Sequence, residues 1–443
     1  MKAFLLKTPQ SLPSDGGELM RAWGRWGGAA AMAIVAGVAL SSTVVVAEPA
    51  HADQIRDMQY WLADYGFDDA WVTSKGAGVK VAVIDTGIDG SVAELKGAIV
   101  GGMDASGIGS PNGQTPIGDN DQHGTMVASL LAGRGRGPVP GSGVIGVAPE
   151  AELLAASVAF GSNTGSTISN DEQIASAVRW AVDNGAKVIN MSLTRNTPDW
   201  PQSWDEAFLY AFEHDVVVVA AAGNRGAGTT AVGAPATIPG VLTVAGVDRN
   251  GEASFDASSQ GITISVAAPS EDLVGVVPGG GYARWDGTSG AAPIVSGLVA
   301  LVRSAYPELN AAEVINRVIA TADPHGHTVP SPIYGNGLID AAAALDREVA
   351  APTTDPTTLL KDWIHLHRRA AVAPSEEVPS SQEPIVVKPD PPLPERDTLA
   401  LMFSGGFSST AIAVPLMVLA GFVILVVLLG IGATRHFRRI LRR

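Results

Sequence analysis

Cysteine is absent from all 443 positions of the chain. Its absence excludes disulfide bonds, thiolate zinc sites, iron–sulfur clusters and cysteine nucleophiles together. Basic residues are scarce as well, with 29 Lys and Arg against 44 Asp and Glu, which gives a formal net charge of −15. Nucleic-acid-binding surfaces carry the opposite balance, so we expect no nucleic acid among the partners. Apolar residues make up 46% of the chain, which is enough to bury a sizeable core.

Charge is missing from a long stretch near the beginning of the chain. Residues 26–47 follow four basic residues and lead to Ala50-His51-Ala52. A basic lead, an apolar run and small residues before the cut are typical of a secretory signal peptide, which we predict over residues 1–52. The run is longer than usual, so an uncleaved signal anchor is the alternative, and Met20 is an alternative start.

A second charge-free stretch lies between Asp397 and Arg435. It predicts a transmembrane segment over 401–434, with a helix at about 411–432 of the ~20 apolar residues that cross a bilayer. Five arginines follow in residues 435–443 and place that tail in the cytoplasm. We therefore expect a single-pass protein of the cell membrane whose folded part is extracytoplasmic. A buried core helix is the alternative interpretation.

Proline recurs between residues 351 and 400 and predicts a semi-rigid linker that packs no core. Within it, Leu359 to Val372 has the pattern of a short amphipathic helix. We favour a local helix in a stalk over a docking motif. The folded part of the chain is thus expected at about 53–350.

Short apolar, β-branched runs alternate with helical patterns in the folded part. Strands are predicted at 79–84, 153–160, 187–193 and 216–221, and helices at 171–184 and 204–214. This alternation indicates an α/β fold with a central, mostly parallel sheet flanked by helices. Ligands of such folds bind at the carboxyl ends of the strands, so the residues that follow the strands matter most.

Four polar residues stand after a predicted strand or at the start of a helical pattern: Asp85, His123, Asn224 and Ser289. Each has an ordinary structural explanation taken alone. A carboxylate can cap a turn, a histidine can be structural, an asparagine can sit in a turn, and a serine can cap a helix. One edge of a parallel sheet can collect all four, however, and the chain order Asp, His, Ser is that of subtilisin.

The blocks that carry these residues resemble the subtilisin-family serine proteases (subtilases, peptidase S8). They read VAVIDTGID, HGTMVASLLAG, VVAAAGN and GTSGAAPIVSGLVALV, and INMSL and YGNGLIDAAAAL add to the match. The resemblance covers about 75–345 and implies a subtilisin-like fold and serine endopeptidase activity for a catalytic domain at 75–350. Three departures are visible: INMSLG of the family reads INMSLTR here, Gly290 follows the nucleophile where bulkier residues are common, and the disulfides that family members often carry are excluded.

The resemblance also implies roles for the four residues. Ser289 would be the nucleophile, because His123 can take its proton, and Asp85 would orient and stabilise the imidazole. Asn224 would supply the oxyanion hole with its side-chain amide, together with the backbone N–H of Ser289.

An extended substrate is expected, by resemblance, between residues 163–166 and Ser192–Thr194. The residues expected to bind it are Ser192, Leu193, Thr194, Ala222 and Gly223. Arg195 and Arg225 lie near them in the sequence, which suggests a preference for an acidic or strongly polar residue before the cleaved bond. The alternative is that both arginines point to solvent.

Three acidic residues around the loop before His123, namely Asp104, Asp119 and Asp121, raise the question of structural calcium. No ligand loop is recognisable there, and surface acidity is the preferred interpretation. We expect no metal and no cofactor.

The layout of the whole chain resembles the mycosins, membrane-anchored subtilases of type VII secretion systems. A short extension at 53–74 precedes the domain, and a linker and a membrane segment follow it. The resemblance implies that the extension packs on the protease, and that the partners are a polypeptide substrate, components of the secretion complex and the lipid bilayer. A mainly structural subunit in which proteolysis is dispensable is the alternative function, and the complete Asp-His-Ser set favours the enzyme.

Overall fold

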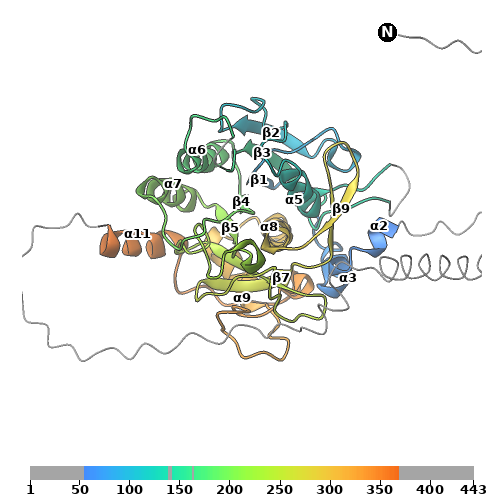
Figure 1. Cartoon of the computed structure of the whole chain (residues 1–443). Coiled ribbons are helices and arrows are strands. Elements are labelled where there is room, and N and C mark those ends of the chain that lie inside the picture. Colours follow the sequence, from blue (N-terminus) through green and yellow to red (C-terminus); the bar gives the residue numbers. More distant parts are fainter. Residues whose placement is uncertain (1–53, 138–141, 162–163, 369–443) are drawn as a thin grey trace, which may run out of the picture. The chain divides into compact units, whose positions relative to one another are not determined.

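A seven-stranded parallel sheet runs through the part of the chain that the computed structural model describes, namely residues 54–137, 142–161 and 164–368 (Figure 1). The strand order is β2-β3-β1-β4-β5-β6-β7. The strands are β1 (Lys80–Asp85), β2 (Ile99–Asp104), β3 (Glu152–Ser157), β4 (Val188–Met191), β5 (Val217–Ala221), β6 (Leu242–Val247) and β7 (Ile264–Pro269). The predicted signal peptide, membrane segment and tail, and most of the predicted linker, lie outside the described residues.

The central strands are continuous apolar runs because helices cover both faces of the sheet. Every residue of β4 and β5 is buried, as are five of the six residues of β1. The mostly parallel sheet expected from the sequence is confirmed. The strands predicted at 153–160 and 187–193 end earlier than expected, at Ser157 and Met191. The residues after them leave the sheet at its carboxyl edge.

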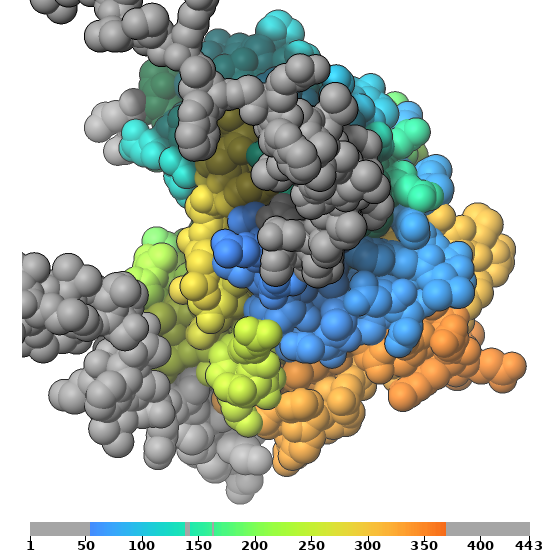
Figure 2. Space-filling view, turned by 90° about the vertical axis from the view of Figure 1, so that its right-hand side faces the viewer, coloured from blue at the N-terminus to red at the C-terminus, as the bar shows by residue number. Residues whose placement is uncertain are grey.

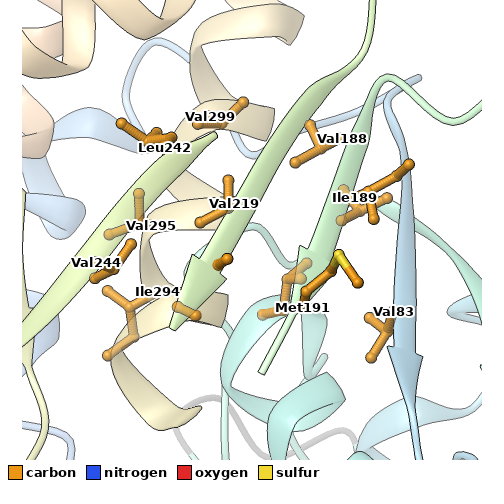
Figure 3. Packing of buried hydrophobic residues seen from close by; sticks show 14 of the residues in the cluster. Val83, Val188, Ile189, Met191, Val219, Leu242, Val244, Ile294, Val295 and Val299 are labelled. Atoms are coloured by element: carbon orange, nitrogen blue, oxygen red, sulfur yellow. The ribbon is translucent and has the colours of Figure 1, made fainter. Parts of the chain in front are cut away.

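Helices flank the sheet, and the longest of them, α8 (Thr288–Ala305), packs along its centre. Figure 3 shows side chains of α8 against those of the central strands: Ile294, Val295 and Val299 against Val219, Leu242 and Val244. Among the described helices, α8 alone is long and apolar enough to cross a membrane, but 83% of it is buried, as in a core helix. Up to residue 350, the other described helices of ten or more residues are α5 (His123–Ala132), α6 (Asn170–Asp183), α7 (Gln202–Glu213) and α9 (Ala311–Ala320), and α10 (Ala341–Asp346) is shorter.

An antiparallel hairpin, β8 (Leu273–Val276) and β9 (Tyr282–Trp285), stands apart from the main sheet and packs on α5. Gly275 of β8 lies so close to α5 that a Cβ there would come within 2.9 Å of the Met126 Cβ. The hairpin is held further by the Val276 N–H, which donates to Ser129 Oγ at 3.0 Å. The hairpin is therefore fixed to the helix that begins at His123.

The N-terminal extension consists of three single-turn helices, α2 (Gln54–Asp57), α3 (Trp61–Asp64) and α4 (Phe67–Ala70), packed on the domain. Trp61 and Phe67 are fully buried. The Tyr60 hydroxyl donates to the Glu271 carbonyl at 2.9 Å. In Figure 2 this segment (blue) lies on the surface between the hairpin region (yellow) and the C-terminal part of the domain (orange).

The fold continues past residue 350, which differs from the expected linker. Helix α11 (Pro356–His367) packs against α7 (Figure 1). Asp355 begins the helix by accepting the Thr358 N–H at 2.9 Å, and Pro356 occupies the first turn, where its missing N–H costs nothing. Leu360 is fully buried. The helix is therefore docked on the domain and is not a local helix in a stalk.

Candidate active site

Asp85 and His123 are brought together at the carboxyl edge of the sheet. Asp85 is the last residue of β1 and only 1% exposed, and His123 is the first residue of α5. Nδ1 of His123 lies 2.8 Å from Asp85 Oδ1 and 3.0 Å from Oδ2. The Thr86 N–H donates to Oδ1 at 2.7 Å, which fixes the carboxylate. The Gly124 N–H donates in turn to Thr86 Oγ1 at 3.1 Å, so the start of α5 is tied to the end of β1.

The environment of His123 stabilises its protonated form. Burial lowers the pKa of His123, but the charge of the Asp85 carboxylate and the hydrogen bond to it raise that pKa further than burial lowers it. The pKa therefore lies above its ordinary value. A base of this kind accepts a proton readily and holds it while the neighbouring carboxylate remains charged.

Ser289 lies in the first turn of α8, one residue after the helix begins at Thr288. Its hydroxyl donates to the Ser192 carbonyl at 3.1 Å, and the Ser192 hydroxyl donates to the Ser289 carbonyl at 2.8 Å. In the described part of the chain Ser289 has no hydrogen bond to His123. Hydrogen bonds of catalytic groups often form only when substrate is bound.

A series of buried side-chain hydrogen bonds next to Ser192 connects Ser192 and Ser289 to the core. Asn190 of β4 donates to Ser192 Oγ at 3.0 Å and accepts the Ser296 hydroxyl of α8 at 2.8 Å. Asn190 and Ser296 are fully buried. The strand and the helix are thus locked in register next to the serine.

Asn224 follows β5 and faces the turn before Ser289. Its Oδ1 accepts both the N–H and the hydroxyl of Thr288, each at 2.9 Å. The side-chain oxygen is therefore occupied, which leaves the Nδ2 amide as a donor. Gly287 has φ +140°, and a Cβ there would lie 2.8 Å from Asn224 Nδ2. Glycine is needed at this turn for the amide to approach the start of α8.

Two contacts at the site had no signal in the sequence. Trp285 of β9 lies edge-to-face against His123, with ring centroids 5.6 Å apart and planes at 79°. The space next to Gly290 is filled, because a Cβ there would lie 2.2 Å from Leu273 Cδ1 and 3.4 Å from Trp285 Cζ2. This explains the glycine after the serine, since the hairpin occupies the volume of a larger side chain. The strands of the hairpin are only four residues long, which is too short for a recognisable alternation of apolar and polar residues.

The residues expected to bind substrate follow two neighbouring strands. Ser192, Leu193 and Thr194 come after β4, and Ala222 and Gly223 come after β5, which pairs with β4. Of the opposite segment, Asn163 lies outside the described residues. The Ser166 hydroxyl donates to the Ser106 carbonyl at 2.6 Å.

Both arginines have partners within the described residues. Arg195 is paired with Asp171. Arg225 donates to the Phe255 carbonyl at 2.7 Å and lies over the Phe255 ring. An acidic preference before the cleaved bond stays a prediction.

Asp104 organises its own loop. Its carboxylate accepts hydrogen bonds from the N–H and hydroxyl of Ser106, from the Ser157 hydroxyl and from the Gly109 N–H. Burial raises the pKa of Asp104, but these hydrogen bonds together outweigh it, so the pKa lies below its ordinary value. In the described ranges no group of three His, Asp or Glu side chains is placed to hold a metal ion.

Comparison with known proteins agrees with this geometry. The profile of the subtilase family of peptidase S8 matches residues 76–337. Subtilisin DY of Bacillus licheniformis is 40% identical over 273 residues, which are 61% of this chain and 92% of that protein. The MycP3 protease from the type VII (ESX-3) secretion system is 34% identical with a TM-score of 0.56, over 65% of this chain and 88% of that structure. MycP1 from Mycobacterium smegmatis is 30% identical with a TM-score of 0.56, over 67% and 87%. The chain belongs to the subtilase family and is a serine endopeptidase.

Proposed function

We propose that the chain is a membrane-anchored, extracytoplasmic serine endopeptidase that acts as a mycosin-like component of a type VII secretion complex. The observation that carries the catalytic part is the hydrogen-bonded pair of Asp85 and His123 at the end of β1, with Ser289 and the Asn224 amide at the same edge of the sheet. The likeness to MycP1 and MycP3 supports the secretion part. The two charge-free stretches of the sequence support the anchoring.

In this proposal the reaction begins when substrate takes the place at the Ser192 carbonyl that the Ser289 hydroxyl now occupies. Ser289 Oγ turns to His123 Nε2, gives up its proton and attacks the scissile carbonyl carbon, forming an acyl-enzyme after the amine leaves with that proton. Asp85 stabilises the imidazolium. The oxyanion accepts hydrogen bonds from Asn224 Nδ2 and from the Ser289 N–H at the start of α8. Water then hydrolyses the ester by the same base.

The test of the catalytic part is labelling of the full chain in membranes with a fluorophosphonate, which reacts only with an activated serine. We expect the wild type to be labelled and Ser289→Ala not to be. Labelling that survives in Ser289→Ala, or a folded wild type that is not labelled, would contradict the assignment.

A mainly structural role is the second candidate. It is favoured by one observation, that MycP1 is described as an essential component of the type VII (ESX-1) secretion system. Capture of membrane partners with wild type and with Ser289→Ala separates the two roles. Equal capture supports a scaffold that needs no cleavage, whereas partners lost with the serine tie assembly to proteolysis.

A further inference from the structure

The loop between β4 and α7, residues 192–201, touches two separate parts of the molecule. Its first residues, Ser192–Thr194, form the substrate wall, a role that rests on the proposed function. Its last residues contact α11. We propose that α11 clamps this loop, so that Trp363 and Arg368 are positioning residues for the substrate wall.

The clamp is built from aromatic stacking and from a charge-assisted hydrogen-bond pair. The rings of Trp363 and Trp200 have centroids 4.2 Å apart and planes at 35°. Arg368 Nε donates to Asp205 Oδ2 at 2.9 Å, and its Nη2 donates to the Trp200 carbonyl at 2.8 Å. The guanidinium also lies over both indole rings. Trp200 is thus held by its ring and by its backbone from the same helix.

Burial makes this clamp strong. Trp200 is 7% exposed and Asp205 is 4% exposed. The Asp205 carboxylate also accepts the Trp200 indole N–H at 2.7 Å, so one buried charge ties the ring, the guanidinium and α7 together. Hydrogen bonds to charged groups contribute more than neutral ones, and losing one partner leaves a buried charge poorly compensated.

From Trp200 the loop reaches the substrate wall through a few fixed points. The Pro198 carbonyl accepts the Thr237 hydroxyl at 2.7 Å, and the Thr197 carbonyl accepts the Ala234 N–H at 3.0 Å. The Arg195 N–H donates to the Ala234 carbonyl at 2.7 Å. Thr194 is the next residue. These hydrogen bonds and the contacts of Trp200 together fix a stretch that has no helix or strand of its own, so loss of the Trp200 contacts leaves the wall with fewer supports.

The end of the loop next to the substrate wall also contacts α7. The Arg195 guanidinium lies over the Trp204 ring, 5.6 Å from its centroid, and Trp204 donates to the Asp171 carbonyl at 3.0 Å. Because α11 packs on α7, one helix pair supports both ends of the loop. The segment that was expected to be an amphipathic helix in a linker therefore supports the loop that forms the substrate wall.

The experiment compares variants of the full chain in membranes by the KM and kcat for peptide cleavage and by the rate of fluorophosphonate labelling. The double variant Trp363→Ala/Arg368→Gln removes the clamp, and Ile364→Pro breaks α11 itself. Trp363→Phe keeps an aromatic ring. The control is Leu366→Ser, since Leu366 lies on the same helix and is 71% exposed. Hydrogen exchange over 356–367 reports whether α11 is released.

With the clamp released we expect KM to rise about five-fold, a size usual for coupling through packed side chains. The labelling rate and kcat should change little, and Trp363→Phe should restore most of the KM. An unchanged KM in a chain whose α11 is released overturns the proposal. So does a parallel loss of kcat, labelling and fold, which would mean a purely structural role. Absent labelling of the wild type would instead contradict the proposed function.

Discussion

The catalytic corner (Asp85, His123, Asn224, Ser289) and the substrate wall (Ser192–Thr194) meet at one edge of the sheet, but they are held differently. The corner residues lie at or next to the ends of core elements, such as the last residue of β1 and the first of α5. The wall begins a loop whose far end depends on a helix from much later in the chain. The corner is part of the core, whereas the wall is tied to the core at Ser192 and depends beyond that residue on contacts of its loop.

This comparison predicts that substitutions in the corner change kcat and those in the wall change KM. The largest effect is expected for Asp85→Asn, which should lower kcat by about 10,000-fold while the fold persists. In the wild type, burial lowers the pKa of His123 and the charge of the Asp85 carboxylate raises it. Without the charge burial dominates, so the acid limb of the pH profile should move to lower pH. The measurement is kcat/KM for a peptide substrate across pH.

The wild type supplies the reference for the sign of that shift. His123 must be neutral to accept a proton, so activity should fall as the pH drops through a value above about 6.5, the ordinary histidine pKa. A wild-type limb well below that value would contradict the raised pKa. Circular dichroism of Asp85→Asn checks that the lost activity is not lost folding.

Asn224→Ala should give the next largest effect, a fall in kcat of about 100- to 1,000-fold with little change in KM. Asn224→Asp is the matched variant, because it keeps the oxygen that accepts from Thr288 but replaces the donor nitrogen. If the amide donates to the oxyanion, the Asp variant should be as slow as the Ala variant. Recovery of activity in Asn224→Asp would mean that capping of Thr288 is its only task.

The corner was predictable from the sequence for a physical reason. A polar residue directly after a buried apolar run has to lie at the carboxyl edge of a parallel sheet, and Asp85 and Asn224 do so. His123 begins α5 and Ser289 lies in the first turn of α8, and small residues of both helices pack closely against that sheet. Local patterns therefore carry the information about where these residues lie, and the blocks that resemble subtilases contain them all.

The supports of the wall were not predictable in the same way. Trp200 and Trp363 meet only because α7 and α11 pack together, and neither helix signals its partner in its own sequence. The contact of Trp285 with His123 likewise depends on a hairpin of four-residue strands. Gly290 was visible as a departure from the family, but its cause, the crowding by Leu273, required the tertiary structure.

Gly233→Ala tests the wall from its other side. Gly233 packs so closely that a Cβ would lie 1.9 Å from the Arg195 carbonyl oxygen and 2.4 Å from Thr194 Oγ1, so the wall must shift. We expect kcat/KM for peptides to fall by about 10- to 100-fold, mainly through KM, with fluorophosphonate labelling retained. Gly281→Ala is the control, because its closest contact is the end of the Val277 side chain at 3.2 Å. A fall in labelling equal to the fall in kcat/KM would show that corner and wall are not separable.

The smallest expected effect is a difference between the two ion pairs of α11 in how much each stabilises the docked helix. Arg368 and Asp205 are 26% and 6% exposed in their side chains, whereas Lys361 and Glu213, 2.7 Å apart, are 52% and 42% exposed. Solvent screens the exposed pair, so Lys361→Gln should lower the free energy of local opening of α11 by about 0.5 kcal/mol or less. Arg368→Gln should lower it by about 1.5–3 kcal/mol, since the buried carboxylate loses a charged donor. Hydrogen exchange of the α11 amides measures both, and equal losses would mean that aromatic packing alone docks the helix.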